Sequence, residues 1–523
     1  MKRMYLFCVL FLTAVCFSLT ASASESAIHS VAISENAVTV SVTAQADCAL
    51  WCAVYEESGK MTAATSENVS GATDAQTVTL SFDAIPANAY VKAFLLDNTF
   101  RPLCVAGDAR NDNDPVYTSD VYAILYADGT LVFQHGNTPR PGLEVQATYA
   151  VDMEERYYYD YQNGTPTTPW YHDRDSIKQF EFADKIRPQS IEYWFYGYSN
   201  LEGISNLNYL DTSNITDMYK LFYNCSSLRA LDFGALNTSN VTNMSRMFYN
   251  CSSLRTLDLN NCNTSNVTDL DWMFHNCRSL TELDLGDFDT SKVTRMGRMF
   301  YNCSSLRRLN LSNFNTSKAR DMYAMFHNCR SLTELDLSNF NTTRVTNMGL
   351  MFYNCSSLTA LDLSNFNTSG VTDMGEMFYN CSSLTALDLS NFNTSMVTNM
   401  NAMFDNCSSL TALDVSNFNV SSVTNMSCMF YGCTLLVSID LSSFNTERVN
   451  NMGLMFSGCS ALVTIYASEQ FATSRAGSSS GVFNDCRSLV GGAGTRYDES
   501  HGDIGYAHID GGLDNPGYFT AKT

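Results

Sequence analysis

The stretch MFYNCSSLTALDLSNFNTS, residues 351–369, occurs again without a change at 377–395. The cysteine of this phrase returns every 26 residues, at 225, 251, 277, 303, 329, 355, 381, 407, 433 and 459, and Cys486 comes one residue late. Tyr198 fills the same position upstream, as in a degenerate first unit. A fixed period of this length is typical of solenoids, in which each unit buries its apolar side against its neighbours.

Each unit is expected to form one strand and one short helix. In LTALDLS, Leu387 and Leu389 alternate with Asp388 and Ser390, which predicts a short strand with one face inward. The polar Asn-Thr-Ser that follows suits a helix cap. The next apolar residues share one helical face: Val397, Met400, Met403 and Phe404. The sequence therefore predicts a mixed α/β solenoid with strands on one side and helices on the other.

The consensus NTSxVTxMxxMFYNCSSLTxLDLSxF contains an LxxLxL strand after an F-x-x-C-x-x-L turn, and it resembles leucine-rich repeats. The whole unit is similar to the 26-residue repeat of the BspA-like family of bacterial surface proteins, over roughly residues 190–488. The closing YAHIDGGLDNPGYFTAKT also resembles the tail that follows such arrays. The resemblance implies a leucine-rich-repeat solenoid, a secreted or cell-surface location, adhesion or host-interaction roles, and no catalytic residues.

The chain start reads as a secretory signal. MKRMYLFCVLFLTAVCFSLTASAS has a basic Lys2-Arg3 pair, a mostly apolar run over 5–19 and a small-residue cleavage site at 21–23. We expect the mature protein to be extracellular or at the cell surface, with no transmembrane segment after cleavage. The predicted domains are the signal peptide (1–23), a β-sandwich (24–108), a connecting subdomain with the N-terminal cap (109–190), the leucine-rich-repeat solenoid (191–488) and a C-terminal cap (489–523).

The region before the repeats is expected to be β-rich. AVTVSVTAQ, CALWCAVYEES, QTVTLSFDAI and AYVKAFLLD read as short strands separated by turn-forming residues, which favours an immunoglobulin-like or fibronectin-like sandwich. Cys48, Cys52 and Cys104 lie here, and an exported protein permits a disulfide without fixing the pairing. In DARNDNDP (108–115), the acidic residues resemble the start of a calcium loop, but Pro115 and Val116 break that pattern and favour a linker.

The charge balance narrows the class of partner. The chain has 31 basic and 53 acidic residues, a net charge of −22. Nucleic acids and anionic membrane surfaces require clusters of Lys and Arg, so neither is expected as a partner. An extracellular protein or glycan remains, and so do cations.

Three patterns suggest chemistry and are better explained by structure. Gly477 to Gly481 matches G-x-S-x-G, but no apolar strand precedes it as a nucleophile elbow requires. His275 and His327 replace a repeated tyrosine and are expected to line the surface. The cysteine column lacks the paired spacing of zinc sites, and in-register side chains do not converge as a disulfide requires, so buried free thiols are expected.

One column of the strands offers a candidate binding strip. Its acidic members are Asp232, Asp258, Asp284, Asp336, Asp362, Asp388, Asp414 and Asp440, and Asn310 and Tyr466 occupy the same column. Water could simply solvate these carboxylates, whose mutual repulsion discourages aggregation. Alternatively the strip binds a basic protein segment, or calcium bridges adjacent carboxylates.

We therefore expect a non-enzymatic protein that binds a protein or glycan partner through the repeat surface. A passive spacer in a surface layer is the main alternative. A secreted hydrolase with its site in 24–190 is a weaker one, because that region shows no paired carboxylates or catalytic triad. No cofactor is predicted, apart from the calcium considered above.

Overall fold

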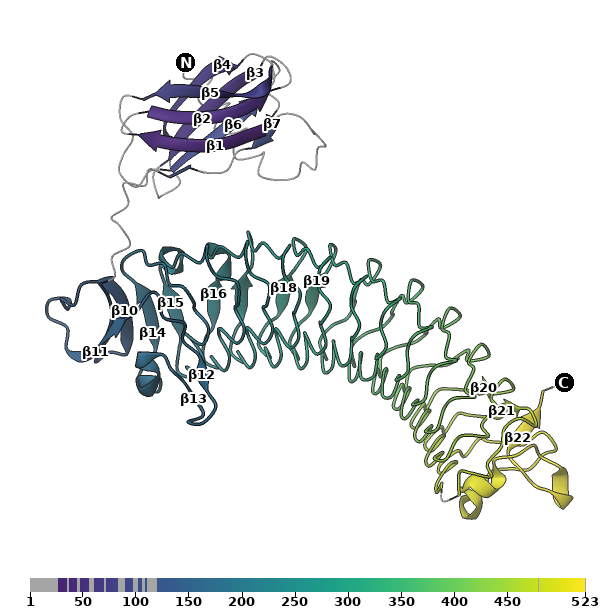
Figure 1. Ribbon diagram of the computed structural model, residues 1–523. Helices are drawn as coiled ribbons and strands as arrows, with labels where there is room; N and C mark the ends of the chain where they lie inside the picture. The colour runs from purple at the N-terminus through teal and green to yellow at the C-terminus, as the bar shows by residue number, and fades with distance from the viewer. Residues whose placement is uncertain are drawn as a thin grey trace. The chain divides into compact units, whose positions relative to one another are not determined.

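The computed structural model describes residues 27–34, 37–44, 48–55, 61–69, 72–82, 90–96, 102–105, 109–110, 120–477 and 479–522. The chain forms two compact units, Met1–Thr118 and Ser119–Thr523 (Figure 1). The predicted signal peptide and most of the 108–115 linker lie outside the described residues. Within the part that is described, no helix is long and apolar enough to cross a membrane.

The first unit consists of two antiparallel sheets, and the four runs that the sequence marked as strands supply four of the eight strands described in them. One sheet has the order β1-β2-β5 and the other the order β4-β3-β6-β7, with β8 paired to β6. Val38, Val40, Leu50, Cys52 and Leu80 are buried. The strands are β1 (Ala27–Ser34), β2 (Ala37–Ala44), β3 (Cys48–Tyr55), β4 (Met61–Val69), β5 (Ala72–Ser81), β6 (Tyr90–Leu96), β7 (Pro102–Val105) and β8 (Ala109–Arg110).

Cys52 is a free thiol in this unit, and burial raises its pKa to about 12. The side chains of Cys48 and Cys104 are outside the described residues, so a disulfide that involves them stays a prediction.

The second unit opens with a five-stranded cap in the order β11-β9-β10-β14-β15. Pairing changes from antiparallel between β9 and β10 to parallel between β10 and β14, so the cap ends in the strand direction that the repeats use. Its elements are β9 (Val121–Tyr126), β10 (Thr130–His135), β11 (Val145–Val151), the β12 (Tyr159–Asp160) and β13 (Thr165–Pro166) hairpin, the 3₁₀ helix η1 (Pro169–Asp173), β14 (Gln179–Phe182), β15 (Gly203–Ser205) and η2 (Leu207–Tyr209).

The cap and the repeats share one hydrophobic core. Phe133 lies 5.1 Å from Trp170 and 5.4 Å from Trp194, measured between ring centroids, and all three side chains are fully buried. Phe195 then stacks on Phe222 at 4.9 Å and starts a phenylalanine column that continues to Phe483. Residues 120–190 are thus packed as the first layer of the repeat array.

From about residue 190 each repeat forms one coil, and successive coils lie side by side in a curved row (Figure 1). Where strands are regular they pair in parallel with a shift of one repeat, as Leu231 does with Leu257. The repeat strands are β16 (Ala230–Asp232), followed by η3 (Phe233–Ala235), then β17 (Thr256–Asp258), β18 (Glu282–Asp284), β19 (Arg308–Asn310), β20 (Ser438–Asp440) and β21 (Thr464–Ala467).

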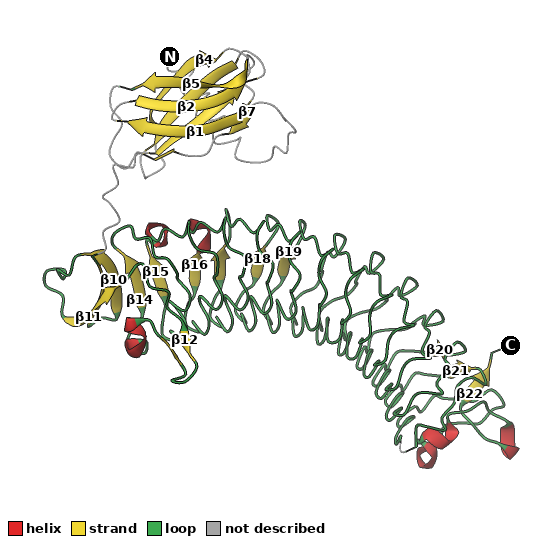
Figure 2. Cartoon of the chain, in the orientation of Figure 1, coloured by secondary structure: helices red, strands yellow, loops and turns green. Residues whose placement is uncertain are grey.

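The prediction of one short helix per repeat is wrong. The described residues contain 3₁₀ helices but no α-helix, and the segment expected to be helical consists of turns (Figure 2). The backbone N–H groups of Met400, Ala402, Phe404 and Asn406 donate to carbonyl oxygens of the next coil at 2.7–3.0 Å. A helix would need the same donors for its own carbonyl groups. Ala402 and Asn406 also have positive φ, 49° and 55°, which a right-handed helix excludes.

Recurring polar positions of the repeat form hydrogen bonds between adjacent coils. The buried Thr394 hydroxyl donates to the carbonyl of Asn419 at 2.9 Å and accepts from the N–H of that residue at 2.8 Å. The Asn391 amide donates to the carbonyls of Leu363 and Phe366 in the preceding coil at 2.9 and 2.8 Å. These bonds satisfy backbone groups that a lone coil would leave unpaired. These bonds explain why the polar segments NTS and SNF are repeated together with the apolar residues.

The coils fan apart from one side to the other. Tyr353 and Tyr379 stack at 4.4 Å, and the interior rings of Phe352 and Phe378 lie 5.7 Å apart. Next to the strands, Phe340 and Phe366 are separated by 6.5 Å. In the four coils between β19 and β20 the strand positions form no regular ladder: residues 334–336, 360–362, 386–388 and 412–414. Where no ladder forms, a coil is therefore a wedge that is wider on its strand side.

The array ends in a cap whose last strand, β22 (Phe519–Ala521), pairs in parallel with β21. Burial works to raise the pKa of Asp510, but donors from Thr495, Gly512 and Gly517 outweigh it and hold that pKa well below its usual range. This carboxylate ties the loops of the cap together. The remaining elements are η4 (Glu499–His501), η5 (Ile504–Tyr506) and η6 (Gly512–Asp514).

Candidate functional site

The acidic column predicted from the sequence lies on the strand side of the coils, which we call the strand face. Asp440 is half-buried and the other seven aspartates of the column are exposed, one on each coil. Inward-facing leucines alternate with them, as the strand pattern predicted: Leu387 is 7% exposed and Leu389 is 1% exposed. The structure thus brings the predicted strip together as a row that follows the coil axis.

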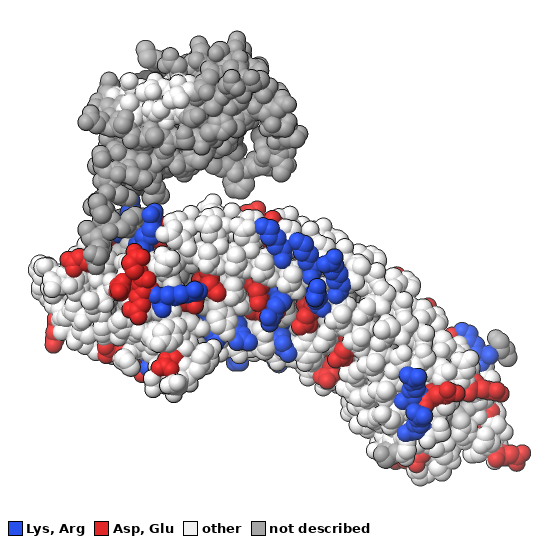
Figure 3. Space-filling view, in the orientation of Figure 1, with Lys and Arg blue, Asp and Glu red and all other residues white. Residues whose placement is uncertain are grey.

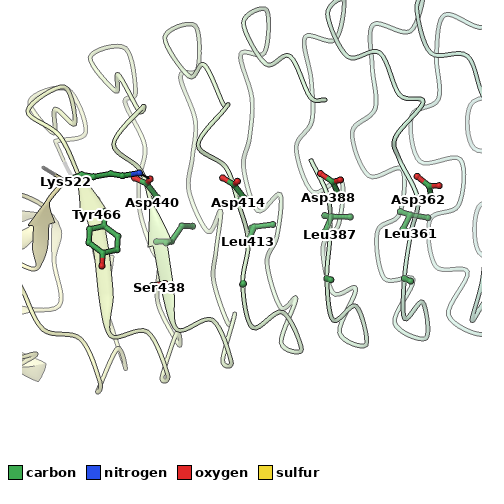
Figure 4. A pocket seen from close by; sticks show the side chains of 14 residues that line it. Leu361, Asp362, Leu387, Asp388, Leu413, Asp414, Ser438, Asp440, Tyr466 and Lys522 are labelled. Carbon is green, nitrogen blue, oxygen red and sulfur yellow. Dashed lines mark hydrogen bonds and ion pairs between the residues drawn. The ribbon is translucent and has the colours of Figure 1, made fainter. Parts of the chain in front are cut away.

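A groove of about 810 Å³ runs along the C-terminal half of this face (Figure 4). Ala360, Ala386 and Ala412 contribute small side chains to it, beside the edges of the neighbouring leucines. Four aspartates line it, at positions 362, 388, 414 and 440, and Tyr466 and Lys522 lie at its end (Figure 4). The lining is apolar with a carboxylate row, and we call it the acidic groove.

Each carboxylate of the acidic groove also stabilises a turn. The Oδ1 atoms of Asp362, Asp388 and Asp414 each accept a 2.9 Å hydrogen bond from the backbone N–H two residues later. The N–H and the hydroxyl of Ser364 lower the pKa of Asp362, and those of Ser390 lower the pKa of Asp388. The groove is therefore fully charged at neutral pH. The sequence did carry this signal, because Asp-x-Ser is a typical side-chain turn.

Asn310 shows that this turn does not require a charge. It occupies the aspartate position of its own coil and accepts the same bond from the N–H of Ser312, at 3.0 Å. An Asp→Asn change in this column accordingly removes the charge and keeps the turn acceptor.

Lys522 was not foreseen as a member of the site. Its Nζ forms an ion pair with the Asp440 carboxylate, from a position directly after β22 (Figure 4). Burial acts to raise the pKa of Asp440, but the hydrogen bonds from Lys522 and Ser442 and the charge of Lys522 together outweigh it, so that pKa is lowered. No ion pair joins Asp362, Asp388 or Asp414 to any residue that the structure describes.

The N-terminal half of the strand face differs in charge. A second groove, of about 990 Å³, is lined there by residues of both signs, including Arg255, Arg308, Glu282 and Glu334. Arg308 lies 3.4 Å from Glu282, and the Asn310 amide donates to Asp284 at 2.8 Å. These side chains can satisfy one another. On the visible face of the unit, basic and acidic residues lie side by side in patches with uncharged surface between the patches (Figure 3).

The histidines do not line the surface as expected. His275 stacks between Tyr249 and Tyr301 at 4.4 and 4.5 Å, in a column of rings on the side away from the strands, and is 5% exposed. His327 is 7% exposed in the same column. Burial, aided by nearby arginines, lowers the pKa of His275 to about 3 and that of His327 to about 4. Both imidazoles are neutral packing elements.

Asp405 interrupts the ring column. It stands where Tyr379 and Tyr431 stand in the adjacent coils and is 6% exposed. Burial, and then the charge of Glu376, raise its pKa to about 7. Asn406 donates to its carboxylate at 2.8 Å. Among the described residues, no group of three or more His, Cys, Asp or Glu side chains is arranged to hold a metal ion, here or in the acidic groove.

The serine of the G-x-S-x-G pattern serves the backbone. The Ser479 hydroxyl is 5% exposed, donates to the Ala476 carbonyl at 2.7 Å and accepts from the Met452 N–H at 2.9 Å. It joins the last regular coil to the one after it.

Three overlapping stretches of the chain, 189–307, 276–386 and 358–469, match the sequence model of a family described as "Mycoplasma protein of unknown function, DUF285". Together they extend from residue 189 to residue 469, more than half of the 523 residues. No curated protein matches the chain.

Proposed function

The chain belongs to the family whose sequence model matches its repeats, and we propose, from the pattern of those repeats, that it is an extracellular binding protein of the BspA-like leucine-rich-repeat type. Its array would be a leucine-rich-repeat solenoid. Two features support this assignment: several coils bury all three leucines of an LxxLxL segment, as with Leu384, Leu387 and Leu389, and the regular strands pair in parallel one repeat apart. The apolar leader-like start of the sequence supports secretion.

The binding surface would be the strand face, and the partner an extracellular protein. The observation that carries this proposal is the acidic groove, which crosses five coils and keeps three charged carboxylates exposed. Charges on an exposed face add little to folding stability. They do steer a partner of opposite charge and suppress unwanted ones. A glycan is a less suitable partner, because Tyr466 is the one aromatic residue among those that line the groove and could stack on a sugar ring.

The test compares two charge-matched variants of the full chain. The first replaces Asp362, Asp388 and Asp414 by Asn. The second replaces Asp152, Asp498 and Asp503 by Asn; these exposed residues also accept a bond from the N–H two residues later, at 2.8–2.9 Å. Both variants have the same net charge and lose the same kind of carboxylate.

Wild type and both variants are then tested for binding to extracellular-matrix proteins and to a glycan array. We expect the groove variant to lose a protein partner that the control variant keeps. If both variants bind that partner equally, the strand face is not the binding surface. If wild type binds nothing on either panel, the passive-spacer alternative is favoured.

A further inference from the structure

The floor of the acidic groove has small side chains, which would allow the main chain of an extended peptide to lie close to it. Two residues before each of its first three aspartates, the groove is lined by a methyl group, at Ala360, Ala386 and Ala412. The corresponding positions of the second groove have longer side chains, among them Glu282, Arg308 and Glu334. A peptide main chain can therefore come close to the floor in the C-terminal half of the strand face, and larger side chains prevent this in the N-terminal half.

At the N-terminal end of the acidic groove, the spacing of the coils on the strand side is close to that of alternate residues in an extended peptide. The rings next to the strands repeat at 6.4 Å from Phe314 to Phe340 and at 6.5 Å from Phe340 to Phe366. In an extended chain, side chains on one face recur every second residue, at about 6.6–6.8 Å. Ordinary strand stacking at about 4.8 Å would not give this match. The coils of Asp362, Asp388 and Asp414 belong to the same stretch without a regular strand ladder, which supports a similar spacing of their carboxylates.

The chain itself supplies one example of the recognition. Lys522 follows the extended segment β22 and places its ammonium group on Asp440, the last carboxylate of the row. Its side chain is 49% exposed, so the pair forms at the surface of the groove and not within the core. Asp414, Asp388 and Asp362 continue the row with no such partner among the described residues.

We propose that the acidic groove binds an extended basic segment of a partner protein in which Lys or Arg alternates with small residues. Each basic side chain would meet one aspartate of successive coils, and the main chain would lie along the alanine floor. This inference rests on the proposed function, because it specifies the partner of the strand face. It extends that function from protein binding to the recognition of a charge repeat.

Three acetylated peptides test the register. One alternates alanine with three lysines, the second has the same composition with its lysines adjacent, and the third replaces lysine by glutamate in the alternating order. Binding to the full chain is measured by calorimetry at physiological salt, because weak ion pairs are screened. We expect the alternating basic peptide to bind about tenfold more tightly than the adjacent-lysine peptide, and the acidic peptide not to bind.

The charge-matched variants then localise the site. The Asp362/Asp388/Asp414→Asn variant should lose the preference for alternation, and the Asp152/Asp498/Asp503→Asn variant should keep it. Lys522→Gln frees Asp440 and should favour a longer alternating peptide with a fourth lysine. Equal affinity for both basic peptides, or an equal effect of both triple variants, overturns the inference. The proposed function survives that result if the groove variant still loses its matrix partner.

Discussion

The Sγ–H group of Cys381 donates a 3.2 Å hydrogen bond to the carbonyl oxygen of Phe352, in the preceding coil. Equivalent bonds of 2.9–3.2 Å are formed by the other cysteines of the column, from Cys225 to Cys486. All of these cysteines are free and buried. The thiols therefore serve as small packing groups that also satisfy a backbone acceptor, in agreement with the expectation of free buried thiols.

The column should react slowly with thiol reagents in the native protein. Burial raises the pKa of Cys381 to about 12, and only the thiolate is reactive. Cys428 is the internal control, because its side chain is half-buried and outside the column. Mass spectrometry after a short pulse of iodoacetamide should find label at Cys428 well before Cys381. Labelling of Cys381 at the same rate, or disulfides between adjacent coils, would contradict the packing role.

The inward direction of the strand leucines can be tested with one pair of neighbours. Leu387→Asp places a charge in the apolar layer and should cost several kcal/mol of the free energy of unfolding. Ala386→Asp adds the same group at an exposed position and should cost less than about 1 kcal/mol. Chemical denaturation followed by circular dichroism measures both. Equal losses would mean that the two side chains do not point to opposite faces.

Asp405 should make the protein less stable as the pH rises. Its folded pKa is raised to about 7, so between its unfolded pKa, about 4, and pH 7 the folded state holds a proton that the unfolded state has lost. Stability therefore falls across that window, by up to about 1.4 kcal/mol per pH unit. Asp405→Asn should flatten the slope, whereas Asp362→Asn, at an exposed site, should not. Melting temperatures from pH 4 to 8 give the comparison.

The stacked histidines should act in the opposite direction. The folded pKa values of His275 and His327 are about 3 and 4, below the unfolded value of about 6.5. As pH falls from about 6.5 towards 4, the histidines bind protons in the unfolded state but not in the folded state, so the free energy of unfolding decreases.

Replacing both histidines by Tyr, the residue that other repeats have at this position, should make the protein more tolerant of acid in the same titration. His172→Tyr changes an exposed histidine and should leave the acid limb unchanged. An unchanged acid limb in the double variant would show that neither ring titrates abnormally.

The periodic features of this fold were the predictable ones. The position of Leu387 in its strand follows from alternation within a few residues, and the cysteine column follows from the period. The helix was wrongly predicted because Val397, Met400 and Met403 share one face both in a helix and in a tight coil. The deciding partners are the carbonyl groups of the next coil, which no local pattern contains.

In the candidate site, too, the repeated features could be predicted from the sequence and the contacts between distant residues could not. The row of aspartates could be listed from the sequence, and the turn role of Asp388 was readable in Asp-x-Ser. The ion pair between Lys522 and Asp440 joins residues that are 82 positions apart in the sequence. Lys522 lies outside the repeats, so the repeat consensus could not predict this pair. The strand side is also spaced more widely than the ring side, at 6.5 Å between Phe340 and Phe366 against 4.4 Å between Tyr353 and Tyr379. This difference is a property of the assembled coils and of no single repeat.

The wedge shape of the coils gives the array an asymmetric stiffness. Its ring column is already in van der Waals contact, with Tyr301 and His327 at 4.1 Å, so tighter bending is resisted by compression. Straightening meets less resistance, because it closes the strand side towards the spacing at which backbone ladders form. A pull on the two ends would therefore shorten the interval between neighbouring carboxylates. Mechanical tension would thus take the acidic groove out of step with an extended basic segment.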